Sequence, residues 1–173
     1  DAAIEFLKKA IAIRPSKAFY YYSMGWMYYR KKDYNAALEW FGKGREINPH
    51  LSYNLVGIGW TYLDKGYPEK AVKTFKKAED LEAFSAYDCP YSGLGLAYRM
   101  MGQSQQSVHY YTKAIETNPY DSRLYLDLIK VYEKSGQTDK ISLVIDKIRR
   151  LPYIDKHVRE YIDSYKSREN KEG

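Results

Sequence analysis

Apolar and aromatic residues recur along this chain at three- and four-residue intervals, in paired stripes separated by short turns. Such spacing predicts amphipathic helices, each with one face turned toward a core. Glycine is expected at the turn between the two helices of a pair, and proline at the turn between one pair and the next. These turn residues are Gly66, Gly102 and Gly136 within pairs, and Pro15, Pro49, Pro119 and Pro152 between pairs.

A glycine, a tyrosine and a small residue return at the same phase of each pair. The glycines are Gly25, Gly59 and Gly95, the tyrosines three residues later are Tyr28, Tyr62 and Tyr98, and the small residues twelve positions after each glycine are Ala37, Ala71 and Ser107. The first two glycines are 34 residues apart and the next two are 36 apart, so we expect a two-residue insertion near Ala86–Tyr87. Glycine inside a helix costs about 1 kcal/mol relative to alanine. Its recurrence therefore predicts close approach of the facing helix, and a repeat of this length predicts a stack of similar units.

This pattern resembles the tetratricopeptide repeat family. The matching residues are Tyr21, Met24, Gly25, Tyr28, Ala37, Phe41, Gly44 and Pro49 in one unit, Leu55, Ile58, Gly59, Tyr62, Ala71, Phe75 and Ala78 in the next, with Ala83 in place of the closing proline, and Tyr91, Leu94, Gly95, Tyr98, Ser107, Tyr111, Ala114 and Pro119 in the third. The resemblance implies an all-α fold, a right-handed α-solenoid of stacked antiparallel helix pairs. It determines architecture better than function, because one scaffold serves many unrelated assemblies.

The units divide the chain into a single repeat domain with incomplete parts at both ends. The expected boundaries are 1–16 for the second helix of a truncated unit, 18–51, 52–85 and 88–121 for complete units, 122–155 for a degenerate unit, 154–168 for a capping helix and 169–173 for a disordered tail. In the truncated unit, we expect Ile4, Leu7 and Ile11 to contact an upstream helix or a second copy of the chain.

The degenerate unit has Ile129 and Ile141 where both small residues should be. Because these positions face each other, we expect this helix pair to be spread more widely, with the isoleucines filling the gap. The segment that follows it, 154–168, has apolar residues on one face and charged residues on the other. That pattern is typical of a helix that covers the last open face of a repeat stack.

Composition and charge limit the classes of partner. The 173 residues are 45% hydrophobic, which is enough to build a continuous core. The formal charge is +6, with both signs scattered along the chain, so we expect a mild preference for acidic partners and no dedicated nucleic-acid tail. No run of about 18 apolar residues occurs. We therefore expect no membrane span and a soluble, cytoplasmic protein, with any targeting segment upstream of Asp1.

The residue types that perform catalysis are not gathered into a known motif. His50, His109 and His157 are far apart, whereas a metal site needs at least three convergent ligands. Cys89 precedes Pro90 at the start of a predicted helix, where the helix N-terminus would favour a thiolate. No histidine nearby in the repeat offers it a base, so a plain small residue is the better interpretation. We expect no enzyme activity, no cofactor and no metal.

The first helices of successive units are expected to line a concave groove. Its predicted lining is Phe19, Tyr22, Trp26, Tyr29, Arg30, Tyr53, Val56, Trp60, Leu63, Leu96, Arg99, Arg123, Lys130 and Lys134, with Cys89, Ser92 and Glu133 at the same phases. The N-terminal half is aromatic and the C-terminal half is basic. Tryptophan and tyrosine often anchor interfaces because they bury a large area at low entropy cost. Packing between neighbouring helices is the alternative role for Trp26 and Trp60.

The sequence therefore predicts a scaffold that binds a segment of another protein in this groove, with apolar anchors at one end of the segment and acidic residues at the other. Some family members bind the acidic tail of chaperones through lysine, asparagine and arginine at fixed phases. Here those phases hold Tyr22, Trp26, Val56, Trp60, Ser92 and Leu96, so that function is disfavoured. The alternatives are self-association through the uncapped N-terminal end and, less favoured because the charge is balanced, binding of single-stranded RNA.

Overall fold

A computed structural model describes residues 2–81 and 89–172, and this part of the chain contains ten α-helices and no strand. The insertion expected near Ala86–Tyr87, and Ala83 in the place of a closing proline, lie outside the described residues. The helices are α1 (Ala2–Ile13), α2 (Ala18–Arg30), α3 (Tyr34–Ile47), α4 (Ser52–Asp64), α5 (Pro68–Glu79), α6 (Tyr91–Met100), α7 (Ser104–Thr117), α8 (Ser122–Lys134), α9 (Asp139–Arg149) and α10 (Lys156–Glu172).

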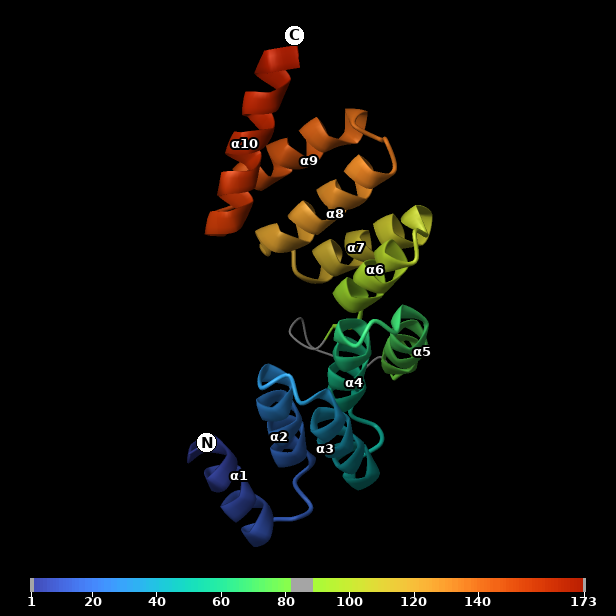
Figure 1. Cartoon of the computed structure of the whole chain (residues 1–173), viewed down its shortest axis with the longest axis vertical. Coiled ribbons are helices and arrows are strands. Elements are labelled where there is room, and N and C mark those ends of the chain that lie inside the picture. The colour runs from blue at the N-terminus through green and yellow to red at the C-terminus, as the bar shows by residue number, and fades with distance from the viewer. Residues whose placement is uncertain (1, 82–88, 173) are drawn as a thin grey trace.

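Helices that follow one another along the chain pack side by side as antiparallel pairs, and the pairs are stacked into an elongated molecule (Figure 1). The pairs are α2 with α3, α4 with α5, α6 with α7, and α8 with α9. The first helices of neighbouring pairs, α2, α4, α6 and α8, also contact one another in sequence. The predicted all-α solenoid of stacked helix pairs is confirmed.

Rings of the second helices pack directly onto glycines of the first helices. A Cβ atom added at Gly25 or at Gly57 would lie 2.5 Å from the ring of Phe41, and one added at Gly93 would lie 2.2 Å from the ring of Phe75. Phe41 and Phe75 are both completely buried. Burial of such a ring contributes about 1.5–3 kcal/mol, which offsets the low helix propensity of the glycines beneath it. Close approach of the facing helix was predicted for Gly25 and is found there, whereas the approach of the preceding unit's ring to Gly57 and Gly93 was not predicted.

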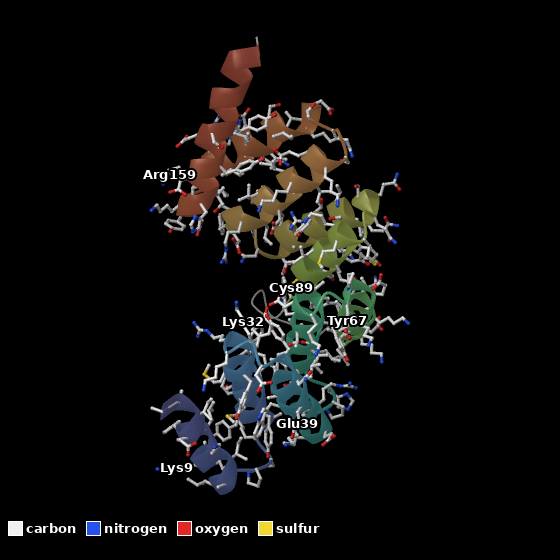
Figure 2. All side chains as sticks on the ribbon, viewed as in Figure 1. Lys9, Lys32, Glu39, Tyr67, Cys89 and Arg159 are labelled. Atoms are coloured by element: carbon white, nitrogen blue, oxygen red, sulfur yellow. The ribbon has the colours of Figure 1, made fainter. Side chains whose placement is uncertain are left out.

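The turns inside the pairs need a left-handed backbone. Gly66, Gly102 and Gly136 have φ between 70° and 78°, and in the first complete unit the equivalent residue is Lys32, with φ of 61°. Lys32 lies in the turn that joins α2 to α3 (Figure 2). Since a side chain makes this conformation costly, the lysine is a local exception to the rule that the three glycines follow.

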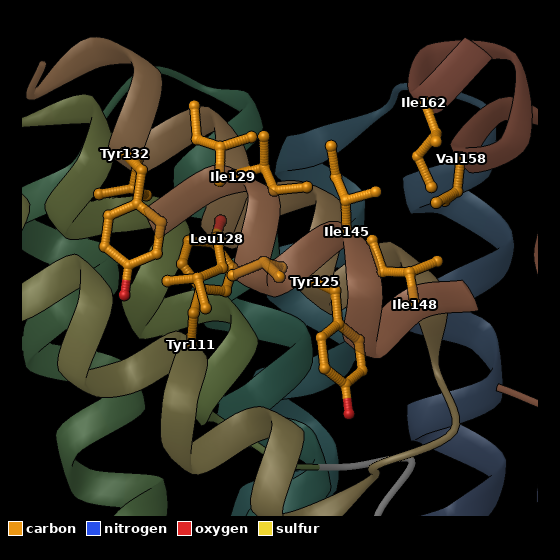
Figure 3. Packing of buried hydrophobic residues seen from close by; sticks show 12 residues of the cluster. Tyr111, Tyr125, Leu128, Ile129, Tyr132, Ile145, Ile148, Val158 and Ile162 are labelled. Atoms are coloured by element: carbon orange, nitrogen blue, oxygen red, sulfur yellow. The ribbon is translucent and has the colours of Figure 1, made fainter. Parts of the chain in front are cut away.

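The degenerate unit is packed by isoleucines. Ile129 of α8 and Ile141 of α9 are completely buried, within a cluster that extends from Tyr111 to Ile162 (Figure 3). Fewer residues of α8 and α9 have backbones close to each other than in the three preceding helix pairs. Beside them, α7, α8 and α9 surround an open cavity of about 300 Å³. The wider spacing of this pair therefore follows from its two large residues.

The last helix extends further than predicted. α10 buries Val158 and Ile162 in the same cluster as α8 and α9, and it continues to Glu172. The helix therefore includes most of the segment 169–173 for which disorder was predicted, and Gly173 lies outside the described residues. Lysine, arginine and glutamate have good helix propensity, so the helix continues through this polar segment.

The apolar side chains that α1 exposes are not the ones predicted. Ile4 is buried within the chain itself, against the prediction that it waits for an upstream helix or a second copy, and Leu7 and Ile11 are half-buried. Instead, Phe6 is 73% exposed and Ile13 is 77% exposed. In the described part of the chain, none of the helices combines the length and the apolar character that crossing a membrane requires.

Candidate partner-binding groove

The side chains predicted to line the groove lie on α2, α4, α6 and α8, which are neighbours in the stack. Two of them, Val56 and Leu63, are only 4% and 3% exposed and belong to the core of the second complete unit. They cannot offer surface to a ligand as predicted, because the α4 helix is covered on more than one face by α2, α5 and α6. The other candidates are at least partly exposed.

Five aromatic rings form a continuous row along α2 and the start of α4, in the N-terminal half of the stack. This aromatic row consists of Phe19, Tyr22, Trp26, Tyr29 and Tyr53. Ring centroids are 5.8 Å apart for Phe19 and Tyr22, 6.1 Å for Tyr22 and Trp26, and 4.8 Å for Trp26 and Tyr29. Tyr53 joins α4 to the row, with its centroid 4.7 Å from that of Tyr22. Tilted and edge-to-face arrangements of this kind are favourable and stiffen the row.

The two groove tryptophans occupy equivalent places in successive units. The Trp26 ring lies edge-on to Phe41, with centroids 5.6 Å apart and planes at 80°, and the Trp60 ring lies edge-on to Phe75 at 5.8 Å and 79°. Both rings are half-buried. The indole N–H of Trp26 is buried without a hydrogen-bond partner in the described part of the chain. Each tryptophan therefore packs against its own unit and keeps one part of its surface open.

Two cavities open along this surface. One, of about 390 Å³, is lined by Phe19 and Tyr53 together with the ends of the neighbouring helices. The other, of about 220 Å³, is lined by Trp60 of α4, Ser92 of α6 and Arg123 of α8. The second cavity matters for function because it joins a residue of the aromatic half to a residue of the basic half across three helices.

The basic residues differ in how their charge is used. Arg123 makes a bidentate pair with Asp121, with Nε to Oδ1 at 2.9 Å and an Nη to Oδ2 at 2.8 Å. This pairing, opposed by burial, lowers the pKa of Asp121 and raises that of Arg123. Arg99 and Lys130 both face one oxygen of Asp127, at 3.6 Å and 3.7 Å. Arg123 is therefore neutralised locally, whereas Arg99 and Lys130 share a single carboxylate.

The aromatic end and the C-terminal end each hold one acidic partner. Burial, and after it a hydrogen bond to Asp64, raises the pKa of Tyr29 above its ordinary value. At the other end, the hydroxyl of Tyr161 on α10 donates a hydrogen bond to Glu133. Lys134 is exposed at the end of α8, and Arg30 is exposed at the end of α2.

Cys89 lies where α6 begins, on the wall of the cavity that Trp60 and Arg123 line (Figure 2). Burial raises the pKa of its thiol, against the weaker effect of hydrogen bonds from Tyr91 and Thr117. The raised pKa supports a thiol in a packing role rather than the thiolate that a helix N-terminus could favour. Within the described residues, no three side chains of the metal-binding types come together.

Sequence reasoning missed three polar residues of this surface. Asp121 lines the cavity beside Arg123, and Asp127 faces Arg99 and Lys130. Tyr111 is buried close enough to Asp127 and Arg99 for their charges to shift the pKa of its hydroxyl. One sequence signal could have revealed Asp127, because the equivalent position is glycine in the two preceding units. Tyr111 stands where the two units before its own have Phe41 and Phe75.

The stacked pairs and the shared face of their first helices define a helical repeat scaffold. Residues 18–51, 53–84 and 90–121 each match the tetratricopeptide repeat family, which together is more than half of the chain. The chain belongs to the tetratricopeptide repeat family.

Solved structures share the fold at low sequence identity. TTC0263, a thermophilic protein of this family from Thermus thermophilus, is 19% identical with a TM-score of 0.79, over 95% of this chain and 89% of that one. YrrB, described as having an unusual peptide-binding site, is 18% identical with a TM-score of 0.69, over 84% of this chain and 74% of that one. A chain of the Cut9–Hcn1 hetero-tetramer of the APC/C is 17% identical with a TM-score of 0.73, over 88% of this chain and 29% of that one. At these identities the likeness shows the fold alone. Curated protein sequences gave no match.

Proposed function

We propose that this chain is a protein-binding scaffold that holds a segment of another protein along α2, α4, α6 and α8. The observation that carries the proposal is the cavity shared by Trp60 and Arg123, because it makes the aromatic and basic halves one continuous surface. The peptide-binding site described for YrrB, and the assembly that contains Cut9 and Hcn1, support a binding role for a scaffold of this fold.

The surface favours an extended or helical segment with unequal ends. Phe19 is 52% exposed beside a cavity of about 390 Å³, which suits an apolar side chain of the partner. Large rings bind well here because they are already held by their neighbours and lose little freedom on binding. At the other end, Arg99 and Lys130 favour acidic side chains. The partner segment would therefore run from apolar anchors to acidic residues as it passes from α2 to α8.

Selection of a random displayed peptide library on the full chain tests this proposal. Peptides that bind should lose at least about 30-fold in affinity to the Trp26→Ala, Trp60→Ala double variant, the loss expected when a hot spot of about 2 kcal/mol is removed. Binding is followed by isothermal titration calorimetry, because Trp40 is the one tryptophan that remains in the double variant and its fluorescence would not report on the groove.

Trp40→Ala is the matched control. Trp40 lies on α3, where its ring contacts Tyr21 and Tyr28 rather than the aromatic row. Its loss should lower stability, measured by circular dichroism, and leave peptide affinity unchanged. If the double variant binds as tightly as the parent chain, or if Trp40→Ala weakens binding equally, the groove is not the binding site.

A second candidate function is self-association through α1, which we propose on the exposure of Phe6 and Ile13 beside a cavity of about 330 Å³. A second copy of the chain would cover this apolar face. Sedimentation across a concentration range should show the parent chain gaining mass, and Phe6→Glu should abolish the gain. Leu143→Glu, which changes another exposed large apolar side chain, on α9, should leave it intact. A parent chain that is monomeric at every concentration rejects the idea.

A further inference from the structure

The three junctions between successive units, from 18–51 through to the degenerate unit 122–155, can be compared residue by residue, because each uses the same four positions. One position is a ring on the second helix of a unit, and another is the residue of the next unit that lies in register with that ring. These pairs are Phe41 with Gly57, Phe75 with Gly93, and Tyr111 with Asp127. The first two junctions are apolar at this depth, and the third carries two polar side chains.

The remaining two positions lie on the first helices of the two units that meet at each junction. They are Tyr29 and Trp60 at the first junction, Leu63 and Leu96 at the second, and Arg99 and Lys130 at the third. All four positions therefore change from aromatic or apolar to polar at a single junction. A single polar replacement would be ordinary for a partly exposed surface, but four that converge in space form a site of distinct chemistry. We call this set the polar quartet, consisting of Arg99, Tyr111, Asp127 and Lys130.

The charges of the polar quartet do not balance. Arg99 and Lys130 approach the same Asp127 oxygen at 3.6 Å and 3.7 Å. Charge-assisted hydrogen bonds between such groups are about 2.7–2.9 Å long, so both ion pairs are loose and both cations keep donors for another acceptor. The side chains of Arg99 and Lys130 are 23% and 41% exposed, which leaves them within reach of a ligand.

Tyr111 adds a second sign that the site is incomplete. Its side chain is 1% exposed, and its hydroxyl has no hydrogen-bond partner in the described part of the chain. Burial, and after it the charge of Asp127, raises the pKa of the Tyr111 phenol, so the hydroxyl keeps its proton. Burial also raises the pKa of Asp127, although Arg99 and Lys130 oppose that shift. Arg99 and Lys130 therefore do not fully offset the cost of burying the Asp127 carboxylate. With Asp127 ionised, the two cations and one anion leave the quartet with an excess of one positive charge.

We propose that Arg99 and Lys130 bind a carboxylate group of the partner segment, with Asp127 as the positioning residue that holds the two cations toward each other. This inference rests on the proposed function, since it names the chemical group that the basic half of the groove binds. A carboxylate adds the missing negative charge and accepts hydrogen bonds from both cations. A cationic ligand at Asp127 would instead lie between two positive side chains and be repelled.

Two small probes that differ only in charge test the site directly. Acetyl-glutamate amide and acetyl-glutamine amide are titrated into the isotope-labelled full chain at constant ionic strength, while the Arg99 guanidinium N–H signal is followed by NMR. The glutamate probe should give a saturable shift at Arg99 and the glutamine probe should not. Lys130→Gln should abolish the shift, and Lys43→Gln, which removes the same charge from α3 outside the predicted groove, should preserve it. Equal responses to both probes, or a shift at Arg99 no larger than that at exposed Arg30, overturn the proposal.

The peptide selection separates this inference from the proposed function. For a selected peptide with an acidic residue, Arg99→Gln should weaken binding about fivefold to tenfold, and should have no effect once that residue is changed to its amide. If a groove-binding peptide that contains an acidic residue binds the Arg99→Gln variant as tightly as the parent chain, the carboxylate site is rejected and the scaffold function is retained. A selection without groove binders, combined with a saturable glutamate shift, rejects the scaffold function and retains the site.

Discussion

Replacing Gly57 and Gly42 by alanine makes the same chemical change in two helices, and we expect opposite effects on stability. Alanine is favoured over glycine inside a helix by about 0.5–1 kcal/mol. At Gly42 on α3 a new Cβ meets no atom within 4 Å, so the gain should be realised in full. At Gly57 the new Cβ would lie 2.5 Å from two ring carbons of Phe41. That distance is far below a normal contact.

The ring of Phe41 has nowhere to move. It is completely buried, and it already lies against Gly25, where a Cβ would also be 2.5 Å away. Overpacking of this kind costs about 1–3 kcal/mol. After the gain in helix propensity is subtracted, Gly57→Ala should lower the free energy of unfolding by about 1–2 kcal/mol.

Thermal unfolding followed by circular dichroism measures both effects. For a chain of this size each kcal/mol corresponds to about 2–4 °C in Tm, so Gly57→Ala should lower Tm by about 4 °C and Gly42→Ala should raise it by about 2 °C. Phe41→Leu should cost less in the Gly57→Ala chain than in the parent chain, because the smaller side chain relieves the contact. If both glycine variants shift Tm in the same direction, or if the Phe41 and Gly57 changes are additive, the packing argument is wrong.

Two further predictions concern the backbone and the pH dependence of stability. Lys32→Gly should raise the free energy of unfolding by about 1 kcal/mol, because φ of 61° is costly for lysine. Gly66→Ala, at the equivalent turn of the next unit, should lower it. A lower Tm for Lys32→Gly in thermal unfolding would contradict this reasoning. Burial raises the pKa of Asp127 above its ordinary value of 3.8, so the ionised carboxylate destabilises the folded chain. This destabilisation is absent below about pH 3.8 and reaches its full size above the folded-state pKa. Urea unfolding over a pH series should therefore show Asp127→Asn gaining on the parent chain as the pH rises through that window, and a constant difference would refute the assignment.

Much of the fold could be predicted from residues at fixed phases. The glycine at position 25 and the alanine at position 37 are separated by one helical hairpin, so their pairing is a local property that periodicity reveals. The end of α10 was harder, because its polar sequence resembles a disordered tail and is also compatible with a helix. The burial of Ile4 was missed because phase alone does not show how closely α1 packs against α2.

The candidate site could be predicted in part. Phase placed Trp26, Trp60 and Arg123 on neighbouring helices, but it also placed Val56 and Leu63 there, which the structure buries. It did not identify the polar quartet, because Asp127 and Tyr111 occupy positions that are core positions in the other units.

By itself, the sequence determined that this protein is a stack of helix pairs, since the repeat sets which faces are apolar and where the turns fall. Only the tertiary structure decided which side chains of the first helices remain open and which are covered. It also decided that Arg99 and Lys130 share one carboxylate. These features depend on distances between side chains of successive units, which periodicity along the chain does not give. Such distances are set by the volumes of packed rings and isoleucines, which act across the stack rather than along it.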